Sequence, residues 1–101
     1  MVIKVKHGGA SLSHIPGYGW YLASIVVDFE YRRRGIGSQL MQRVIHKVKE
    51  RPIYLYATSE LGTDIKVLEH FYQKFGFRAL TKAEQRDLNM FPYKANMALY
   101  K

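Results

Sequence analysis

A short cationic turn with closely spaced glycines is the segment of this chain best suited to bind a charged ligand. Consecutive arginines lie directly before Gly35-x-Gly37, and an amphipathic pattern follows. The first backbone N–H groups of a helix have no intrahelical partner, and the helix dipole places partial positive charge at the same end. Glycines let the backbone approach an anion, and arginines add bidentate donors. The segment therefore predicts a phosphate-binding loop made of Arg32, Arg33, Arg34, Gly35, Ile36, Gly37 and Ser38.

The glycine spacing excludes two common phosphate loops. A P-loop requires Gly-x-x-x-x-Gly-Lys-Ser/Thr, which does not occur in this sequence. A dinucleotide fingerprint requires a third glycine at the position that Leu40 occupies. The pattern Arg32-x-x-Gly35-x-Gly37 instead resembles the pyrophosphate loop of the GNAT family of N-acetyltransferases, which bind acetyl-coenzyme A.

A second motif, further along the chain, supports the same resemblance. The run Phe71-Tyr72-Gln73-Lys74-Phe75-Gly76-Phe77 is similar to the Tyr-x-x-x-Gly-Phe end of the family's fourth helix. The two motifs occur in the family's order, and the chain is identified as a member of the GNAT family on that basis. Its short length and its arginine-rich loop also resemble the very short acetyltransferases of some bacteriophages, among them an anti-CRISPR enzyme that acetylates a lysine of its target nuclease.

The resemblance implies a cofactor site and a catalytic residue. In the family, the strand before the loop splays from its parallel neighbour, and the pantetheine arm enters the gap. This implies that Ile25, Val26 and Val27 bind the cofactor, with the backbone of Ile25 and Val27 pairing with the arm and a nearby N–H facing the thioester oxygen. Tyr72 matches a tyrosine that protonates the departing thiolate. Each assignment has an alternative interpretation. The strand at 20–27 could be a plain core strand, the loop at 32–38 a solvated basic turn, and Tyr72 an aromatic residue of the core.

No general base is assigned from the sequence. The acceptor amine must lose a proton, which a carboxylate or a histidine often takes. The strand at 20–27 carries no carboxylate, and Ile65 stands where the family often has an asparagine. Other candidates are better interpreted as surface residues or caps; they are Asp28, Glu30, His14, Glu60 and His70. The histidines lie far apart in sequence, so no metal site is predicted.

Length and composition limit the possible classes of protein. The chain has 101 residues, no cysteine, 48% hydrophobic residues and a net charge of +8. These values predict one globular domain over residues 1–101, without disulfides or a cysteine nucleophile. No apolar run approaches the length of a membrane span or a signal peptide, so a cytoplasmic protein is expected. The positive charge favours polyanionic partners without choosing among them.

Apolar spacing predicts a mixed α/β fold. An edge strand is expected at 1–6, turns at Gly8-Gly9 and 16–19, a returning strand at 10–15 and a buried strand at 20–27. One helix is expected from position 36 until Pro52 ends it, another at 64–75 capped by Thr63 or Asp64 and closed by Gly76, and a short helix after Thr81. Further strands are expected at 53–57, 77–80 and 96–100. The order strand, helix, strand predicts a central parallel pair after three antiparallel strands.

Three functions remain open at this point. The favoured one is an acetyltransferase that transfers acetyl from acetyl-coenzyme A to an amine by direct attack in a ternary complex. The others are a non-catalytic coenzyme A-binding module and a basic nucleic-acid-binding protein. The typical family member has a further strand and two helices before the region where this chain begins. We therefore expect an open acceptor groove, suited to a protein lysine, and an exposed core that a homodimer would cover.

Overall fold

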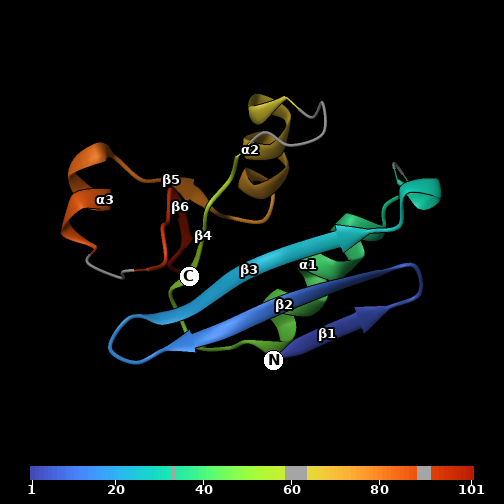
Figure 1. Ribbon diagram of the computed structural model, residues 1–101, viewed down its shortest axis with the longest axis horizontal. Helices are drawn as coiled ribbons and strands as arrows, with labels where there is room; N and C mark the ends of the chain where they lie inside the picture. The colour runs from blue at the N-terminus through green and yellow to red at the C-terminus, as the bar shows by residue number, and fades with distance from the viewer. Residues whose placement is uncertain (33, 59–63, 89–91) are drawn as a thin grey trace.

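The sheet of this protein is mixed and contains a parallel pair at its centre. The computed structural model describes residues 1–32, 34–58, 64–88 and 92–101. The strand order is β1-β2-β3-β4-β6-β5. Figure 1 shows the strands β1 (Val2–Val5), β2 (Gly8–Ile15), β3 (Gly19–Val27), β4 (Ile53–Leu55), β5 (Arg78–Ala79) and β6 (Met97–Leu99), and the helices α1 (Ile36–Lys47), α2 (Ile65–Gln73) and α3 (Lys82–Asp87). A 3-10 turn, η1 (Phe29–Tyr31), follows β3. The mixed α/β architecture predicted from the sequence is confirmed.

The first three strands form an antiparallel meander, with β1 at the edge as predicted. The turn between β1 and β2 lies at positions 6–7, where His7 has a φ of 68°, and the prediction of a turn at Gly8-Gly9 is wrong. Both glycines belong to β2. Packing at Gly8 is tight, because a Cβ there would lie 3.0 Å from Leu40 Cδ1 and 3.1 Å from Ile36 Cγ2 of α1.

Helix α1 covers one face of the meander. Its apolar stripe buries Leu40, Met41 and Val44 completely, as the helical spacing predicts. The helix ends at Lys47 with Val48 in an extended conformation, so Pro52 does not end it. Pro52 instead leads into β4, where its carbonyl accepts the Trp20 N–H at 3.0 Å.

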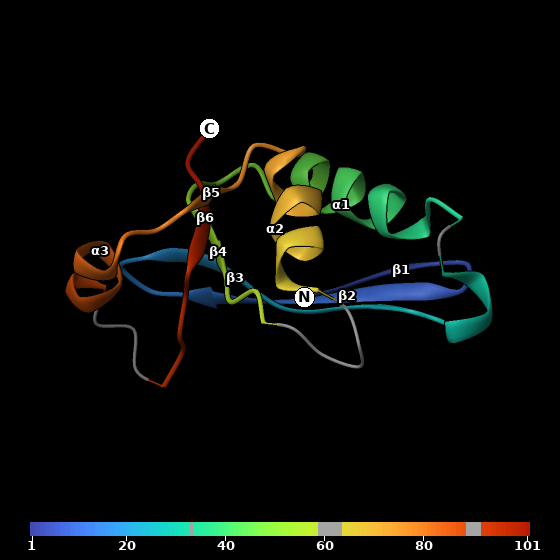
Figure 2. The ribbon, with the colours of Figure 1, turned by 90° about the horizontal axis from the view of Figure 1, so that it is seen from above.

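Helices α1 and α2 lie on the same side of the sheet (Figure 2). Between them and the strands lies the larger core, which includes Leu12, Leu22, Ile53, Leu55 and Phe77. A smaller cluster on the other face contains Tyr54, Leu80, Ala95 and Ala98. Burial raises the pKa of Tyr54 to about 12, and the neighbouring Tyr100 adds to the rise.

The C-terminal elements carry the caps predicted from the sequence. Asp64 caps α2 by accepting the Lys66 N–H at 2.8 Å, and Gly76 follows α2 with a φ of 98°. Thr81 and Glu84 form a capping box at α3. The strand expected at 77–80 is short and extends over Arg78–Ala79. Among the described residues, no helix has the length and apolar character that a membrane crossing requires.

Candidate active site: a cleft between two diverging strands

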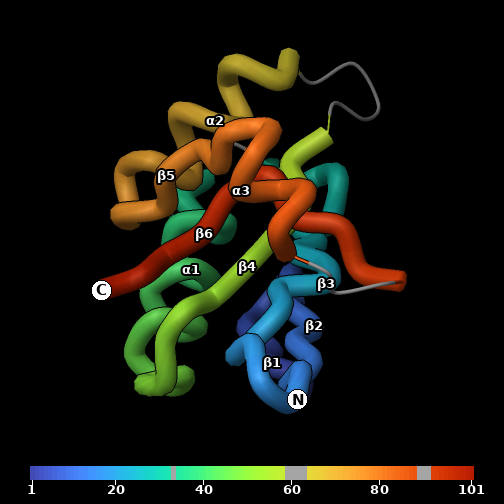
Figure 3. Tube along the Cα trace, turned by 90° about the vertical axis from the view of Figure 1, so that its left-hand side faces the viewer, coloured from blue at the N-terminus to red at the C-terminus, as the bar shows by residue number. Residues whose placement is uncertain are grey.

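Strands β3 and β4 begin side by side and then separate. Their parallel pairing extends from Trp20–Ile53 to Leu22–Leu55 and stops there. Figure 1 shows β3 continuing toward α1 while β4 turns toward α2, and Figure 3 shows β4 between β3 and β6. The separation leaves the second half of β3 without a partner strand on that side among the described residues.

A β-bulge in β3 marks the point of separation. Ser24 pairs with Ser11 and Leu22 pairs with Leu12, so Ala23 is an extra residue. An extra residue shifts the strand's alternation by one. Before the bulge, the Trp20 N–H points to the β4 side, where it donates to Pro52 O. After it, the Asp28 N–H points to β2 and donates to His7 O at 2.9 Å.

The shifted alternation directs two peptide groups into the gap. Because the backbone N–H of Asp28 points to β2, the peptide groups of Val26 point to β2 as well. The N–H and C=O of Ile25 and Val27 point away from β2. Side chains follow the same pattern. Ile25 and Val27 pack on the larger core, whereas Val26 is 57% exposed on the opposite face.

The prediction that β3 is a buried strand is correct only in part. Leu22 is buried, but Ala23, Ser24 and Val26 are exposed. Ser24 and Val26 lie on the face that α1 and α2 do not cover, and the divergence of β4 leaves the edge of this half of the strand unpaired among the described residues. The exposed half is the part that the family resemblance assigns to the cofactor.

The opposite wall of the gap is fixed by Asn96. Its backbone N–H donates to Leu55 O at 3.0 Å, and its side-chain amide makes two bonds of 2.7 Å, accepting from Ala57 N–H and donating to Ala57 C=O. Since Leu55 and Ala57 direct their backbone groups toward Asn96, the peptide groups of Tyr56 point the other way, into the gap.

The gap is a cleft of about 560 Å³. Both diverging strands, the arginine loop and α2 line it, through Leu22–Val27, Arg32, Leu55–Thr58, Leu68 and Tyr72. Tyr72 is 8% exposed, and its ring contacts Phe71 and Phe77. The structure therefore brings Ile25, Val26, Val27, Arg32 and Tyr72 to one cleft, as the sequence-based assignment requires.

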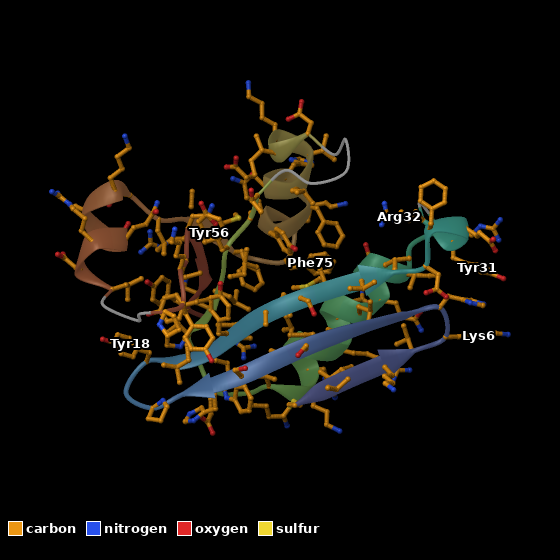
Figure 4. The ribbon with its side chains drawn as sticks, in the orientation of Figure 1. Lys6, Tyr18, Tyr31, Arg32, Tyr56 and Phe75 are labelled. Carbon is orange, nitrogen blue, oxygen red and sulfur yellow. The ribbon has the colours of Figure 1, made fainter. Side chains whose placement is uncertain are left out.

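The predicted phosphate-binding loop at 32–38 (the glycine loop, or arginine loop) leads into α1 beside this cleft. Gly35 is the N-cap in a left-handed conformation with a φ of 79°, and it supplies no side-chain cap for the first N–H groups at positions 36–38. Arg32 Nε lies 3.5 Å from Val27 O at the end of β3. Figure 4 shows Arg32 and Tyr31 together beyond the end of β3. Arg34 lies over the Tyr31 ring at 5.4 Å, and Arg33 lies outside the described residues.

His7 braces the segment that leads into the glycine loop. Its ring stacks on Tyr31 with centroids 3.5 Å apart and planes 7° apart. Its Nδ1 lies 3.6 Å from the Asp28 carboxylate, and its carbonyl accepts the Asp28 N–H. Through His7, the turn between β1 and β2 contacts Asp28 at the start of η1 and Tyr31 at its end. Arg32 follows η1 directly.

The structure assigns no general base. Of the candidates named from the sequence, Asp28, Glu30, His14 and His70 do not line the cleft, and Glu60 lies outside the described residues. His14 instead lies 3.7 Å from the Glu50 carboxylate. Within the described part of the chain, no group of histidine and carboxylate side chains is arranged to hold a metal ion.

Sequence reasoning missed two residues that shape the cleft, Ala23 and Asn96. The bulge at Ala23 leaves one signal in the sequence, because the apolar positions of β3 change from Leu22 to Ile25 and Val27, which breaks a strict period of two. Asn96 leaves no local signal, since its partner Ala57 lies 39 positions away.

Comparison with known proteins agrees with this geometry. The sequence matches the model of the GNAT acetyltransferase domain over residues 2–79, and no curated protein matches it significantly. A GNAT acetyltransferase from Staphylococcus aureus Mu50 superposes with a TM-score of 0.67 at 28% identity, over 94% of this chain and 58% of that one. The anti-CRISPR protein AcrVA5 shares the fold, with a TM-score of 0.65 at 24% identity, over 97% of this chain and 94% of that one.

A complex of Naa50 from Arabidopsis thaliana with the bisubstrate analogue CoA-Ac-MVNAL also superposes, with a TM-score of 0.58 at 25% identity over 90% of this chain and 62% of that one. This chain therefore spans less than two thirds of the Staphylococcus and Arabidopsis proteins. The family model, in contrast, matches most of the present sequence, including both motifs up to Gly76-Phe77. The protein belongs to the GNAT acetyltransferase domain family.

Proposed function

We propose that this protein binds acetyl-coenzyme A and transfers its acetyl group to an amine. The observation that carries this proposal is the cleft in which β3 directs the peptide groups of Ile25 and Val27 toward a gap that opens beside the glycine loop. A pantetheine arm carries two amides in an extended chain, so it has the donors and acceptors that such a free strand edge needs. The pyrophosphate would then lie at the N-terminus of α1.

The phosphate contacts follow from the geometry of the loop. Three N–H groups at the start of α1 have no side-chain cap, and the helix dipole favours an anion at this end. Arg32 lies at the mouth of the cleft and Arg34 lies next to the capping glycine. A guanidinium can bind phosphate oxygens in a bidentate manner, which would replace the long contact between Arg32 and Val27.

The proposed reaction is direct attack in a ternary complex. The neutral amine attacks the thioester carbonyl carbon, a C–N bond forms, and the C–S bond breaks. A backbone N–H of β3 would stabilise the oxyanion of the tetrahedral intermediate. The amine proton leaves to water, and the Tyr72 hydroxyl would give its proton to the departing sulfur. Tyr72 suits this role because it lines the cleft from α2, opposite the free edge of β3.

A protein amine is the acceptor that we favour. Ser24 and Val26 are exposed on the face of β3 that α1 and α2 do not cover, so the cleft is not enclosed from that side. Tyr56 lines the same cleft and is 47% exposed. An open site of this kind admits a lysine side chain that projects from a large partner.

Calorimetric titration with acetyl-coenzyme A tests the proposal. Wild type should bind, and a folded Gly35→Ala/Gly37→Ala variant should bind at least about tenfold more weakly, because the left-handed cap is disturbed and Cβ atoms obstruct the phosphate. A Cβ at Gly37 would lie 3.4 Å from Phe71, an ordinary contact, so the helix should tolerate it. A folded wild type that binds no acetyl-coenzyme A would contradict the proposal.

A further inference from the structure

The outer edge of β1 carries a second surface, distant from the cleft. Met1 and Leu12 exchange backbone hydrogen bonds, from Leu12 N–H to Met1 O at 2.8 Å and from the Met1 amino group to Leu12 O at 2.9 Å. Alternation then directs the peptide groups of Ile3 toward β2 and those of Val2 and Lys4 outward. No described strand pairs with this outer edge.

Helix α1 forms the second side of a groove along that edge. The groove is about 700 Å³ and is lined by Val2, Ile3 and Lys4 together with Gln39, Gln42, Arg43, His46 and Lys47. The helix residues recur at spacings of three and four, so they form one continuous polar stripe above β1. Figure 1 shows β1 at the border of the sheet with α1 behind it. No carboxylate is among the groove's lining residues.

We propose that this groove binds an extended acidic segment of a partner protein, which adds to the sheet as a strand beside β1. The outward N–H and C=O groups of Val2 and Lys4 would pair with the backbone of the segment. Alternate side chains of an added strand point to the helix side of the sheet. Acidic side chains at those positions would meet Arg43, His46 and Lys47.

The chemistry of the groove favours a peptide over the other occupants. Nucleic acid would use the cations but has no extended backbone that matches the outward peptide groups of a strand. A second copy of this chain would bring the same basic stripe to the same place, and like charges on both sides would repel. Only an acidic extended peptide uses both the strand edge and the stripe.

A proline substitution separates strand addition from attraction between charges. Lys4→Pro removes an outward N–H and leaves the bonds of Ile3 with β2, and edge strands tolerate proline at such positions. The matched control Lys4→Ala removes the same side-chain charge but keeps the N–H. The probe is a short synthetic peptide in which glutamate and valine alternate, titrated by fluorescence anisotropy. A peptide with lysine in place of glutamate serves as the probe control.

Wild type and Lys4→Ala should bind the glutamate peptide with similar affinity, whereas folded Lys4→Pro should bind at least about fivefold more weakly. The Arg43→Gln/Lys47→Gln variant should also bind more weakly and should show a smaller salt dependence. The lysine peptide should not bind. Acetyl-coenzyme A affinity should be the same in all folded variants, so this test is independent of the proposed catalytic function.

Several outcomes would overturn the proposal. Equal affinity of folded Lys4→Pro and Lys4→Ala for the peptide would exclude strand addition. Failure of wild type to bind the peptide, combined with tight binding of a single-stranded oligonucleotide that depends on Arg43 and Lys47, would make the groove a nucleic-acid site. A dimer in sedimentation that dissociates in Lys4→Pro would assign the edge to a second copy.

Discussion

The side-chain amide of Asn96 pairs with both backbone groups of Ala57, each at 2.7 Å, in the way that a neighbouring peptide would. Strand β6 begins only at Met97, so this side chain continues the pairing of β4 beyond the point where the backbone of β6 supplies it. The peptide of Tyr56 is thereby held toward the cleft. We interpret Asn96 as a positioning residue for the β4 wall.

Replacing Asn96 should weaken cofactor binding more than its cost in stability explains. Asn96→Asp keeps the shape of the side chain but places an oxygen against the Ala57 carbonyl, which should cost about 1–3 kcal/mol of stability. Acetyl-coenzyme A affinity, measured by calorimetry, should fall at least about threefold. The control is Thr81→Ala, which removes the cap of α3 at a cost of about 1 kcal/mol and should leave the affinity unchanged. Equal effects of the two variants on affinity would contradict the positioning role.

Tyr72→Phe tests the proposed proton donor. The substitution keeps the ring contacts with Phe71 and Phe77 and removes only the hydroxyl. Once an acceptor is identified by acetyl-lysine mass spectrometry, kcat should fall about 10²–10⁴-fold, while the affinity for acetyl-coenzyme A changes little. Unchanged turnover in the folded variant would remove Tyr72 from the mechanism.

The stacking of His7 on Tyr31 should strengthen the binding of acetyl-coenzyme A, although His7 lies outside the loop at 32–38. His7→Asn deletes the ring that stacks on Tyr31, and asparagine tolerates the left-handed backbone conformation at this position. We expect acetyl-coenzyme A affinity to fall about three- to tenfold, since an aromatic stack contributes about 0.5–1.5 kcal/mol to fixing the loop. Lys6→Ala, a change in the same turn without the stack, should bind as wild type does. If both variants bind equally well, the loop does not depend on His7.

Gly8 and Gly9 provide a matched pair for stability. Gly8→Ala would force a Cβ to within 3.0 Å of Leu40 Cδ1 and of Val26 O, whereas the nearest atom to a Cβ at Gly9 is Ile3 O at 3.6 Å. Gly8→Ala should therefore lower the free energy of unfolding by about 1–3 kcal/mol. Gly9→Ala should change it by about 1 kcal/mol or less. Urea denaturation measures both, and equal values would show that α1 does not press on β2 at Gly8.

Low pH should reduce the stability that the ionised Glu84 carboxylate contributes at the start of α3. Hydrogen bonds from the Arg78 guanidinium, and then from the Thr81 N–H, lower the pKa of Glu84 from 4.5 to about 2. A lowered folded-state pKa means that the contribution of Glu84 to stability is fully present above pH 4.5 and is lost as the pH falls through 2. Glu84→Gln should remove this part of the pH dependence in thermal melts recorded at pH values from 2 to 6. Parallel melting profiles for the two proteins would contradict this assignment.

The parts of the fold that the sequence predicted are those that local patterns determine. The apolar stripe of α1 and the caps at Asp64 and Thr81 each depend on residues within one or two helical turns. The strand before the arginine loop was also predicted, because its β-branched and aromatic residues are contiguous. The two motifs also placed Gly35 directly before one helix and Tyr72 on the next, where the structure has them.

The parts that the sequence did not predict depend on contacts between distant segments. The glycines at 8 and 9 suggested a turn, yet Gly8 is small because α1 packs against it. The family resemblance implied that β3 and β4 diverge, but it did not name the two residues that shape the gap, the extra residue Ala23 and Asn96, which precedes β6. Both decide how the cleft is shaped, and neither changes the local composition.

Amide hydrogen exchange of β3, measured with and without acetyl-coenzyme A, tests the central claim most directly. The Ile25 and Val27 N–H groups point into the cleft and should exchange rapidly in the free protein, then become protected when the pantetheine arm pairs with them. The Val26 N–H faces β2 and should be protected in both states, which makes it an internal control. Protection that appears at Ile25 and Val27 alone is the predicted result. If acetyl-coenzyme A binds and leaves the exchange of both amides unchanged, the cofactor does not occupy the cleft between β3 and β4.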